Sequence, residues 1–262
     1  IYVVKGASAE EFISDVTADG DSLSDRLSSL EKDAAITLEP FPVSVREVIN
    51  KLERGGTAVI PALELVEKRP GDASTSGSMN EDEGDNGKTM VQREYAVISD
   101  YRLVGYIPRE ELLAANILLG NSALVPLDVE LDGSEVGLNL AEEKVELEPI
   151  TDDKGLRGLA IKLEVSANVA DMPSGGDLFR ELDKLERAAE CEIERQAENV
   201  IARSQDLNAD FFEFGAGIEM KEPELEYSKE GWKEIYPELE ISTDVTVSIK
   251  RSYEVVQSAK GA

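Results

Sequence analysis

The chain has 262 residues, of which 41% are hydrophobic and only 5% aromatic, so its cores must be built mainly from aliphatic side chains. Its 55 acidic and 27 basic residues give a formal net charge of -28, which repels nucleic-acid phosphates and anionic lipid headgroups. Histidine is absent and Cys191 is the single cysteine, which excludes an internal disulfide, a multi-thiolate metal site and the histidine-dependent nucleophile pairs.

Residues 1–68 are predicted to form an N-terminal α+β domain that is truncated at its start. Ile1–Val4 favours a strand, and residues 22–32 favour a short helix. Ser44 is suited to cap a helix over residues 45–54, because apolar residues follow it at spacings of three and four. The chain then resumes as a strand in which Pro61 indicates an edge or a bulge.

Residues 69–92 are predicted to be an acidic flexible linker or loop. They are rich in Gly, Ser, Asp, Glu and Asn and cannot bury enough apolar surface to offset the cost of ordering. The GDNGKT stretch resembles the end of a phosphate-binding loop, but Asp82 stands where the first glycine of that motif belongs. A solvated loop is therefore the preferred interpretation.

Residues 93–121 are predicted to form a small β-β-α middle domain. Two short strands lie in EYAVISDYRLVGYI, with a tight turn near Asp100. The helix that follows has Pro108 at its first position and Gly120 as its C-terminal stop.

Residues 122–262 are predicted to form a C-terminal domain, an antiparallel four-stranded sheet covered by one long helix. Residues 159–169 and 239–250 alternate apolar with polar side chains, which is typical of strands with one buried and one wet face. The helix, over about residues 175–204, is roughly 45 Å long and carries one apolar stripe, while its charged remainder is expected to be solvated. The fold class is thus α+β, with several domains.

The stretch ADFFEFGAGI, residues 209–218, holds three of the six phenylalanines of the chain. It comes directly after the long helix, where the chain turns back toward the sheet. We expect Phe211, Phe212 and Phe214 to close the core between helix and sheet, with an exposed ligand patch as the alternative.

Several features in fixed order resemble the Ger(x)C family, the C-subunit lipoproteins of spore germinant receptors (GerAC/GerBC-like). They are RLVGYI, EELLAANILLG, the Glu-rich long helix, LNADFFEFGAGI and GWKEIYPELEISTDVTVSIKR. In that family a similar Asp-Phe-Gly segment follows the long helix, and a Trp and a Phe/Tyr-Pro step lead into the last strand. Trp232 and Tyr236-Pro237 match those positions, and the similarity covers residues 94–253.

The resemblance implies a non-enzymatic lipoprotein subunit of a nutrient germinant receptor, needed for spore germination. Its expected partners are the membrane-embedded A and B subunits of the receptor. An N-terminal lipid anchor, on a cysteine missing from this chain, would hold it on the outer face of the spore inner membrane. No catalytic, cofactor-binding or metal-ligating residue is expected, and nucleic acid is not an expected partner.

Two other functions stay open. The carboxylate excess and the Phe cluster suit an extracytoplasmic binding module for a small molecule or a cation, and a carboxylate-only enzyme is the third alternative. If one surface contacts partners, we expect it at Arg102 and Tyr106 in the RLVGYI strand and at Trp232 and Tyr236. An aromatic residue beside a turn can equally be core, and core is the preferred interpretation for both segments.

Overall fold

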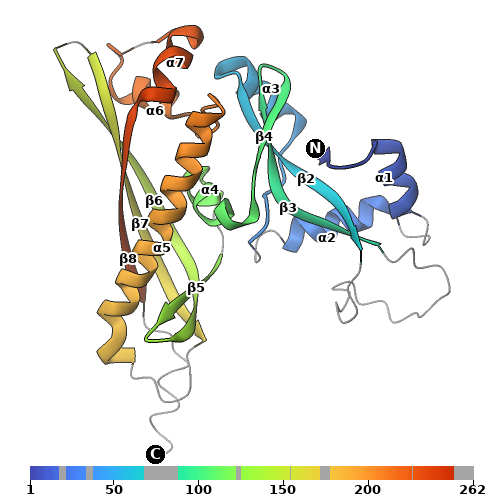
Figure 1. The fold of residues 1–262 in the computed structure, drawn as a ribbon, viewed down its shortest axis with the longest axis horizontal. Coiled ribbons are helices and arrows are strands. Elements are labelled where there is room, and N and C mark those ends of the chain that lie inside the picture. The colour runs from blue at the N-terminus through green and yellow to red at the C-terminus, as the bar shows by residue number, and fades with distance from the viewer. Residues whose placement is uncertain are drawn as a thin grey trace, which may run out of the picture.

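The computed structural model describes residues 1–17, 22–33, 38–67, 88–121, 125–153, 155–171, 178–225 and 227–250. Two four-stranded sheets stand side by side, each with its own helices (Figure 1). The predicted α+β class is confirmed. Most of the predicted linker lies outside the described residues.

The first sheet has the strand order β1-β2-β3-β4. Its strands are β1 (Val3–Val4), β2 (Thr57–Glu67), β3 (Lys88–Ser99) and β4 (Arg102–Ile107). β1 runs parallel to β2, whereas β2, β3 and β4 are antiparallel neighbours. The pairing shifts register between Ala62 and Leu63, next to Pro61, as the bulge interpretation predicts.

The start of β3 differs from the prediction. Lys88 pairs with Glu67 and Gln92 with Leu63, so residues 88–92 of the predicted linker are strand. The polar composition of residues 88–92 gave no strand signal, because the apolar side chains of this pair of strands belong to the partner strand β2. The predicted N-terminal and middle segments therefore contribute to one sheet, and their division into separate domains stays a prediction.

Three helices accompany this sheet: α1 (Ala9–Val16), α2 (Leu23–Asp33) and α3 (Val45–Arg54). α3 has the predicted cap, since the Ser44 hydroxyl accepts from the Glu47 N–H at 3.1 Å. α1 was not predicted, although Ser8 and Glu11 form a reciprocal capping box that its sequence spacing signals.

The second sheet has the order β5-β6-β7-β8. Its strands are β5 (Pro126–Leu131), β6 (Ser134–Asp152), β7 (Gly155–Asp171) and β8 (Glu240–Lys250). The prediction of a fully antiparallel sheet is wrong, because β8 runs parallel to β7. Period-two alternation reports a wet and a buried face but carries no information on strand direction. The helical connection between these two strands returns the chain to the start of β7, as a parallel crossover requires.

The long helix α5 (Leu178–Asp206) covers this sheet, as predicted (Figure 1). Its buried stripe is 0 to 4% exposed and consists of Leu185, Ala189, Ile193, Ala197, Val200 and Ile201. Two of its glutamates are not merely solvated. Glu190 accepts from the Val247 N–H at 3.1 Å and Glu186 accepts from the Ile249 N–H at 2.9 Å. These carboxylates satisfy the outer edge of β8 and block its pairing with another strand.

Between the sheets lies α4 (Leu112–Leu118), preceded by the 3-10 turn η1 (Arg109–Glu111). Every residue of α4 is buried, and one continuous apolar cluster runs from Val97 and Ile107 of the first sheet through α4 into the second. The polar side chain of Asn116 is satisfied there: it accepts from the Tyr95 hydroxyl at 2.8 Å and donates to the Glu39 carbonyl at 3.2 Å.

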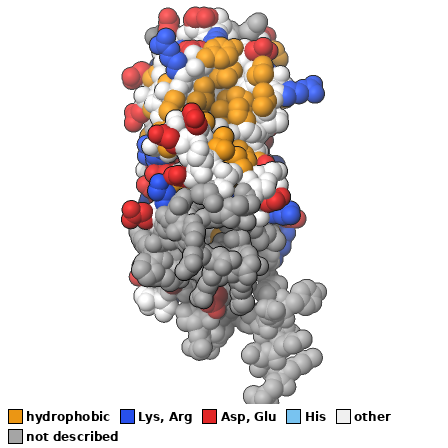
Figure 2. All heavy atoms as spheres, turned by 90° about the vertical axis from the view of Figure 1, so that its right-hand side faces the viewer, with side chains coloured by type: hydrophobic (Ala, Val, Ile, Leu, Met, Phe, Trp, Pro, Cys, Tyr) orange, Lys and Arg blue, Asp and Glu red, His pale blue; other side chains and the backbone are white. Residues whose placement is uncertain are grey.

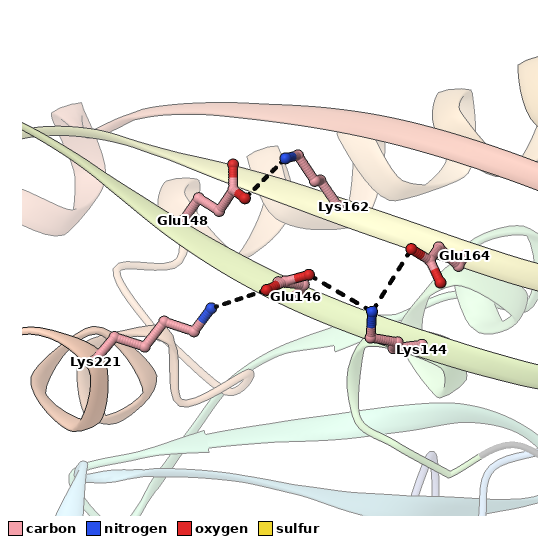
Figure 3. A network of polar contacts seen from close by, with 6 residues as sticks. All are labelled: Lys144, Glu146, Glu148, Lys162, Glu164 and Lys221. Carbon is pink, nitrogen blue, oxygen red and sulfur yellow. Dashed lines mark hydrogen bonds and ion pairs between the residues drawn. The ribbon is translucent and has the colours of Figure 1, made fainter.

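The wet face of the second sheet carries a ladder of opposite charges (Figure 3). Lys144 lies 3.6 Å from both Glu146 and Glu164, and Lys162 donates to Glu148 at 2.7 Å. Lys221 reaches Glu146 at 3.5 Å from α6 (Phe214–Lys221). These pairs are exposed, so each contributes little to stability while keeping the face soluble.

The parallel pairing of β8 generates a testable prediction. Gly158 lies opposite Glu240, and a Cβ at this glycine would stand 2.7 Å from the Glu240 carbonyl oxygen, a backbone atom that cannot turn away. We expect Gly158→Ala to lower the free energy of unfolding in urea by about 1–3 kcal/mol. Gly55→Ala is the control, because its nearest neighbour would be 3.8 Å away, and it should change stability by less than about 0.5 kcal/mol. Equal effects would contradict the pairing.

Candidate interaction site at the β3–β4 hairpin

The β3–β4 hairpin closes with a two-residue turn, Asp100–Tyr101, since Ser99 pairs with Arg102. Both turn residues have positive φ, 47° at Asp100 and 61° at Tyr101. This is the backbone that a tight hairpin needs, but a bulky residue such as Tyr adopts it at a cost. The Tyr101 side chain is nonetheless 71% exposed. The strained turn therefore holds an aromatic ring out in solvent.

Asp100 fixes this turn to the rest of the protein. Its N–H donates to the Gly56 carbonyl at 2.8 Å, and its carboxylate meets Lys229 at 2.9 Å and also Lys233. Both lysines belong to α7 (Lys229–Ile235), which precedes β8. Hydrogen bonds from Lys233 and Lys229 lower the pKa of Asp100. The hairpin tip is thus tied by charge to the unit of the second sheet.

Two glycines permit this close approach. At Gly56, whose φ is 77°, a Cβ would lie 2.2 Å from Cε of Lys229. At Gly105 of β4, a Cβ would lie 2.8 Å from Cδ2 of Leu207. A side chain at Gly56 would displace the end of the Lys229 side chain, which pairs with Asp100, and a side chain at Gly105 would displace the Leu207 side chain.

Two further ion pairs join the same parts. Arg203 of α5 donates twice to Glu111 of η1, with both distances 2.6 Å, in a bidentate arrangement that keeps Arg203 charged and raises its pKa. The Glu111 side chain is only 7% exposed. Lys51 of α3 approaches Glu213 of the α6 N-terminus at 3.5 Å. These ion pairs tie η1 to α5 and α3 to the start of α6, and so hold the base of the hairpin in place.

The outer part of β4 is apolar and exposed. A register shift between Val97 and Ile98 leaves Val104 without a partner in β3. Leu103 is 48% exposed and Val104 is 39% exposed. We call Tyr101, Arg102, Leu103 and Val104 the hairpin surface. Three neighbouring large apolar side chains on a rigid turn are the kind of group that marks a contact surface.

The four residues predicted for an interface fall in different places. Arg102 is exposed and belongs to the hairpin surface. Tyr106 is half-buried, with the Lys5 ammonium 4.7 Å from its ring centre. Trp232 is half-buried on α7 and packs on Tyr236, with ring centres 5.4 Å apart.

Tyr236 corrects the interface prediction. The side chain has 0% exposure, its hydroxyl is hydrogen-bonded to the Ser204 hydroxyl, and burial raises its pKa well above the ordinary value. A residue without accessible surface makes no direct contact with a partner, so Tyr236 is core, as the preferred interpretation held. The interface role of the other residues stays a prediction.

The Phe cluster also lies in the core. Phe211, Phe212 and Phe214 are 1%, 9% and 2% exposed, and their rings follow one another at 4.5 and 5.1 Å. The prediction that they close the core between helix and sheet is confirmed, and the exposed ligand patch is wrong.

Asp210, beside these phenylalanines, is a polar group that the sequence analysis missed. Its carboxylate accepts from the Phe214 N–H at 3.0 Å, the Gly215 N–H at 2.9 Å and the Trp232 indole N–H at 2.9 Å. Desolvation raises the pKa of Asp210 to about 6, although these three donors oppose the rise. The signal in the sequence is an acidic residue set directly before an apolar run.

Among the residues that the structure describes, no group of three or more His, Cys, Asp or Glu is arranged to hold a metal ion. None of the helices described is long and apolar enough to cross a membrane. Cys191 is a free, exposed thiol on α5.

Fold and site together define an α+β protein of two sheets on one shared core, with a firmly held apolar hairpin. The family model for "Spore germination B3/ GerAC like, C-terminal" matches residues 93–253, more than half of the chain. The chain therefore belongs to the spore germination B3/GerAC-like family, and the family resemblance read from the sequence is confirmed.

The fold is similar to a solved structure, "Crystal Structure of the GerBC protein", with a TM-score of 0.61 and 16% sequence identity. The similarity covers 79% of this chain and 61% of the GerBC chain, so this chain spans less than two thirds of that protein. No curated protein matches the sequence.

The Glu111–Arg203 pair generates a stability prediction. Glu111→Gln leaves Arg203 facing a neutral amide in a site where the acidic partner is 7% exposed. We expect the free energy of unfolding in urea to fall by about 1–3 kcal/mol. Glu148→Gln removes an ion pair whose partners are 45% and 46% exposed, and it should cost less than about 0.5 kcal/mol. A neutral effect of Glu111→Gln would mean that this pair does not tie η1 to α5.

Proposed function

We propose that this protein acts in spore germination as the C subunit of a nutrient germinant receptor. The observation that carries the proposal is the family match over residues 93–253, which include the hairpin, α4 and nearly all of the unit of the second sheet. The similarity of fold to GerBC supports it. In this role the protein works through its surfaces, as a non-enzymatic lipoprotein beside membrane-embedded A and B subunits.

The location follows from the same proposal. A lipid on an N-terminal cysteine of the natural protein holds the subunit on the outer face of the spore inner membrane. The net charge of -28 disfavours direct attraction to anionic lipid, so a covalent anchor and protein partners provide the attachment.

Within this role, the hairpin surface is the part that we propose contacts a receptor subunit. Tyr101, Leu103 and Val104 offer apolar area, and Arg102 adds a charged group suited to an interface. The ties from Asp100 to α7 and from Glu111 to α5 hold this surface in one orientation. A pre-organised surface loses little entropy on binding.

Affinity purification tests the subunit role. The full-length tagged protein is recovered from dormant spores after gentle detergent extraction, and everything retained is identified by mass spectrometry. We expect two membrane-embedded subunits and a lipid adduct on an N-terminal cysteine. Recovery of the protein alone and without lipid would sink the proposal.

A matched pair of variants tests the hairpin surface. Leu103 and Ile150 are both 48% exposed, and they lie on different sheets. We expect Leu103→Asp to weaken receptor association by about thirtyfold, which corresponds to about 2 kcal/mol, and to slow germination with nutrients. Ile150→Asp should leave both unchanged. Equal stability of the Leu103→Asp and Ile150→Asp proteins in urea confirms that both are folded. If spores with either variant germinate equally well, the contact with the receptor lies elsewhere.

A further inference from the structure

One face of the first sheet is only partly covered by helices. α3 packs on β2 through Val48 and Leu52, which form one buried cluster with side chains of β2. Ile98 of β3 packs against this cluster and is only half-buried. Its cross-strand neighbour on β4 is Leu103, which is 48% exposed. Directly paired residues point to the same face of a sheet, so the described part of the chain leaves the β3–β4 half of this face open.

The exposed flank of α3 adds to this apolar area. Val45 and Ile49 lie one turn apart on α3 and are 56% and 47% exposed. Figure 2 shows apolar side chains gathered on the upper part of the molecule, at the height that α3 and β4 occupy in Figure 1. We call Val45, Ile49, Ile98, Leu103 and Val104 the open face. An apolar sheet face is normally buried against a second layer, so the open face indicates a partner.

The arginines next to the open face have no acidic partner, although the chain is strongly acidic. Among the described residues, none forms an ion pair with Arg46 and Arg54 of α3 or with Arg102 of β4, and all three are exposed. Arg46 and Arg54 also line a hollow of about 300 Å³ on α3. On the second sheet, by contrast, Lys144 and Lys162 pair with glutamates. Unpaired guanidinium groups beside an apolar surface favour a partner that carries carboxylates.

We propose that an amphipathic helix of a receptor subunit, with acidic residues beside its apolar stripe, binds the open face next to α3. The inference rests on the proposed function, because it takes the partner to be a receptor subunit. A helix whose axis lies about 8–10 Å from that of α3 completes the layer that α3 begins. Its apolar residues, at spacings of three and four, cover Ile49, Ile98 and Leu103, and its carboxylates meet the arginines.

Two other occupants fit the open face less well. A strand added to the edge of β4 extends the sheet sideways and leaves Ile49 and Ile98 uncovered. A second copy of this chain brings a further net charge of -28, and two such charges repel each other. A helix with an apolar stripe and acidic flanks matches both the apolar face and the unpaired arginines.

Photo-crosslinking in dormant spores tests the helix. The full-length tagged protein carries p-benzoylphenylalanine in place of Ile49, Leu103 or Ile150, which are 47%, 48% and 48% exposed. Ile150 lies on the second sheet and is the control. We expect the probes at Ile49 and Leu103 to label one segment of one receptor subunit, at residues three, four or seven apart. The probe at Ile150 should label no receptor subunit.

The possible results separate this inference from the subunit role. Labelling from Leu103 but not from Ile49 means that the partner touches the hairpin alone, which overturns the helix and leaves the subunit role intact. Labelled residues that are two apart identify a strand, and labelling of a second copy of this chain identifies self-association; both overturn the helix. If affinity purification of the unaltered protein retains no membrane-embedded subunit, the subunit role fails and the helix fails with it.

A charge reversal tests the acidic character of the partner. Arg46→Glu is compared with Arg187→Glu, because Arg187 is also an exposed arginine on a helix with no ion pair among the described residues. We expect Arg46→Glu to weaken receptor association by about tenfold at low salt, since it brings a carboxylate against the carboxylates of the partner. Arg187→Glu should leave association unchanged. Equal association of the two variants would contradict an acidic helix on the open face.

Discussion

The burial of α4 on all sides is the constraint on which the rest of the structure depends. A helix whose side chains are apolar at every position but one must be covered in every direction, and no single sheet can do this. Leu112–Leu118 are therefore packed between the two sheets, which makes the two units share one core. The polar group of α4 that lies in this core, Asn116, is satisfied by Tyr95 and by the Glu39 carbonyl.

The hairpin inherits its rigidity from this arrangement. β4 leads through η1 directly into α4, so the strand that carries the hairpin surface is anchored at one end by the shared core. At its other end Asp100 is held by α7, and Glu111 and Arg203 brace the segment between. Apolar packing thus determines where the hairpin stands, and charge determines how its tip is oriented. Exposed apolar side chains lower solubility, so their presence on a rigidly held hairpin favours a role in binding a partner.

Charge has two separate uses in this acidic protein. On the wet face of the second sheet, alternating Lys and Glu residues pair with each other in solvent and contribute little energy (Figure 3). At the junction between the two sheets, a few ion pairs with partly buried side chains join segments that lie far apart in the chain.

Apolar side chains gather on the upper part of the right-hand side of the molecule as drawn in Figure 1, which Figure 2 shows face-on. The protein therefore presents an apolar area within a strongly acidic surface.

The sequence by itself determined the α+β class, the long covering helix, the α3 cap, the hairpin turn near Asp100 and the core role of the phenylalanines. Each of these depends on local spacing, which periodicity and capping residues encode directly. Only the tertiary structure decided the parallel direction of β8, the early start of β3, the burial of Tyr236 and the contacts of Asp210. Those features depend on which distant segment lies opposite, and alternation of side chains is the same for either strand direction. The carboxylates of Glu186 and Glu190 likewise look solvated in sequence until β8 is placed beside them.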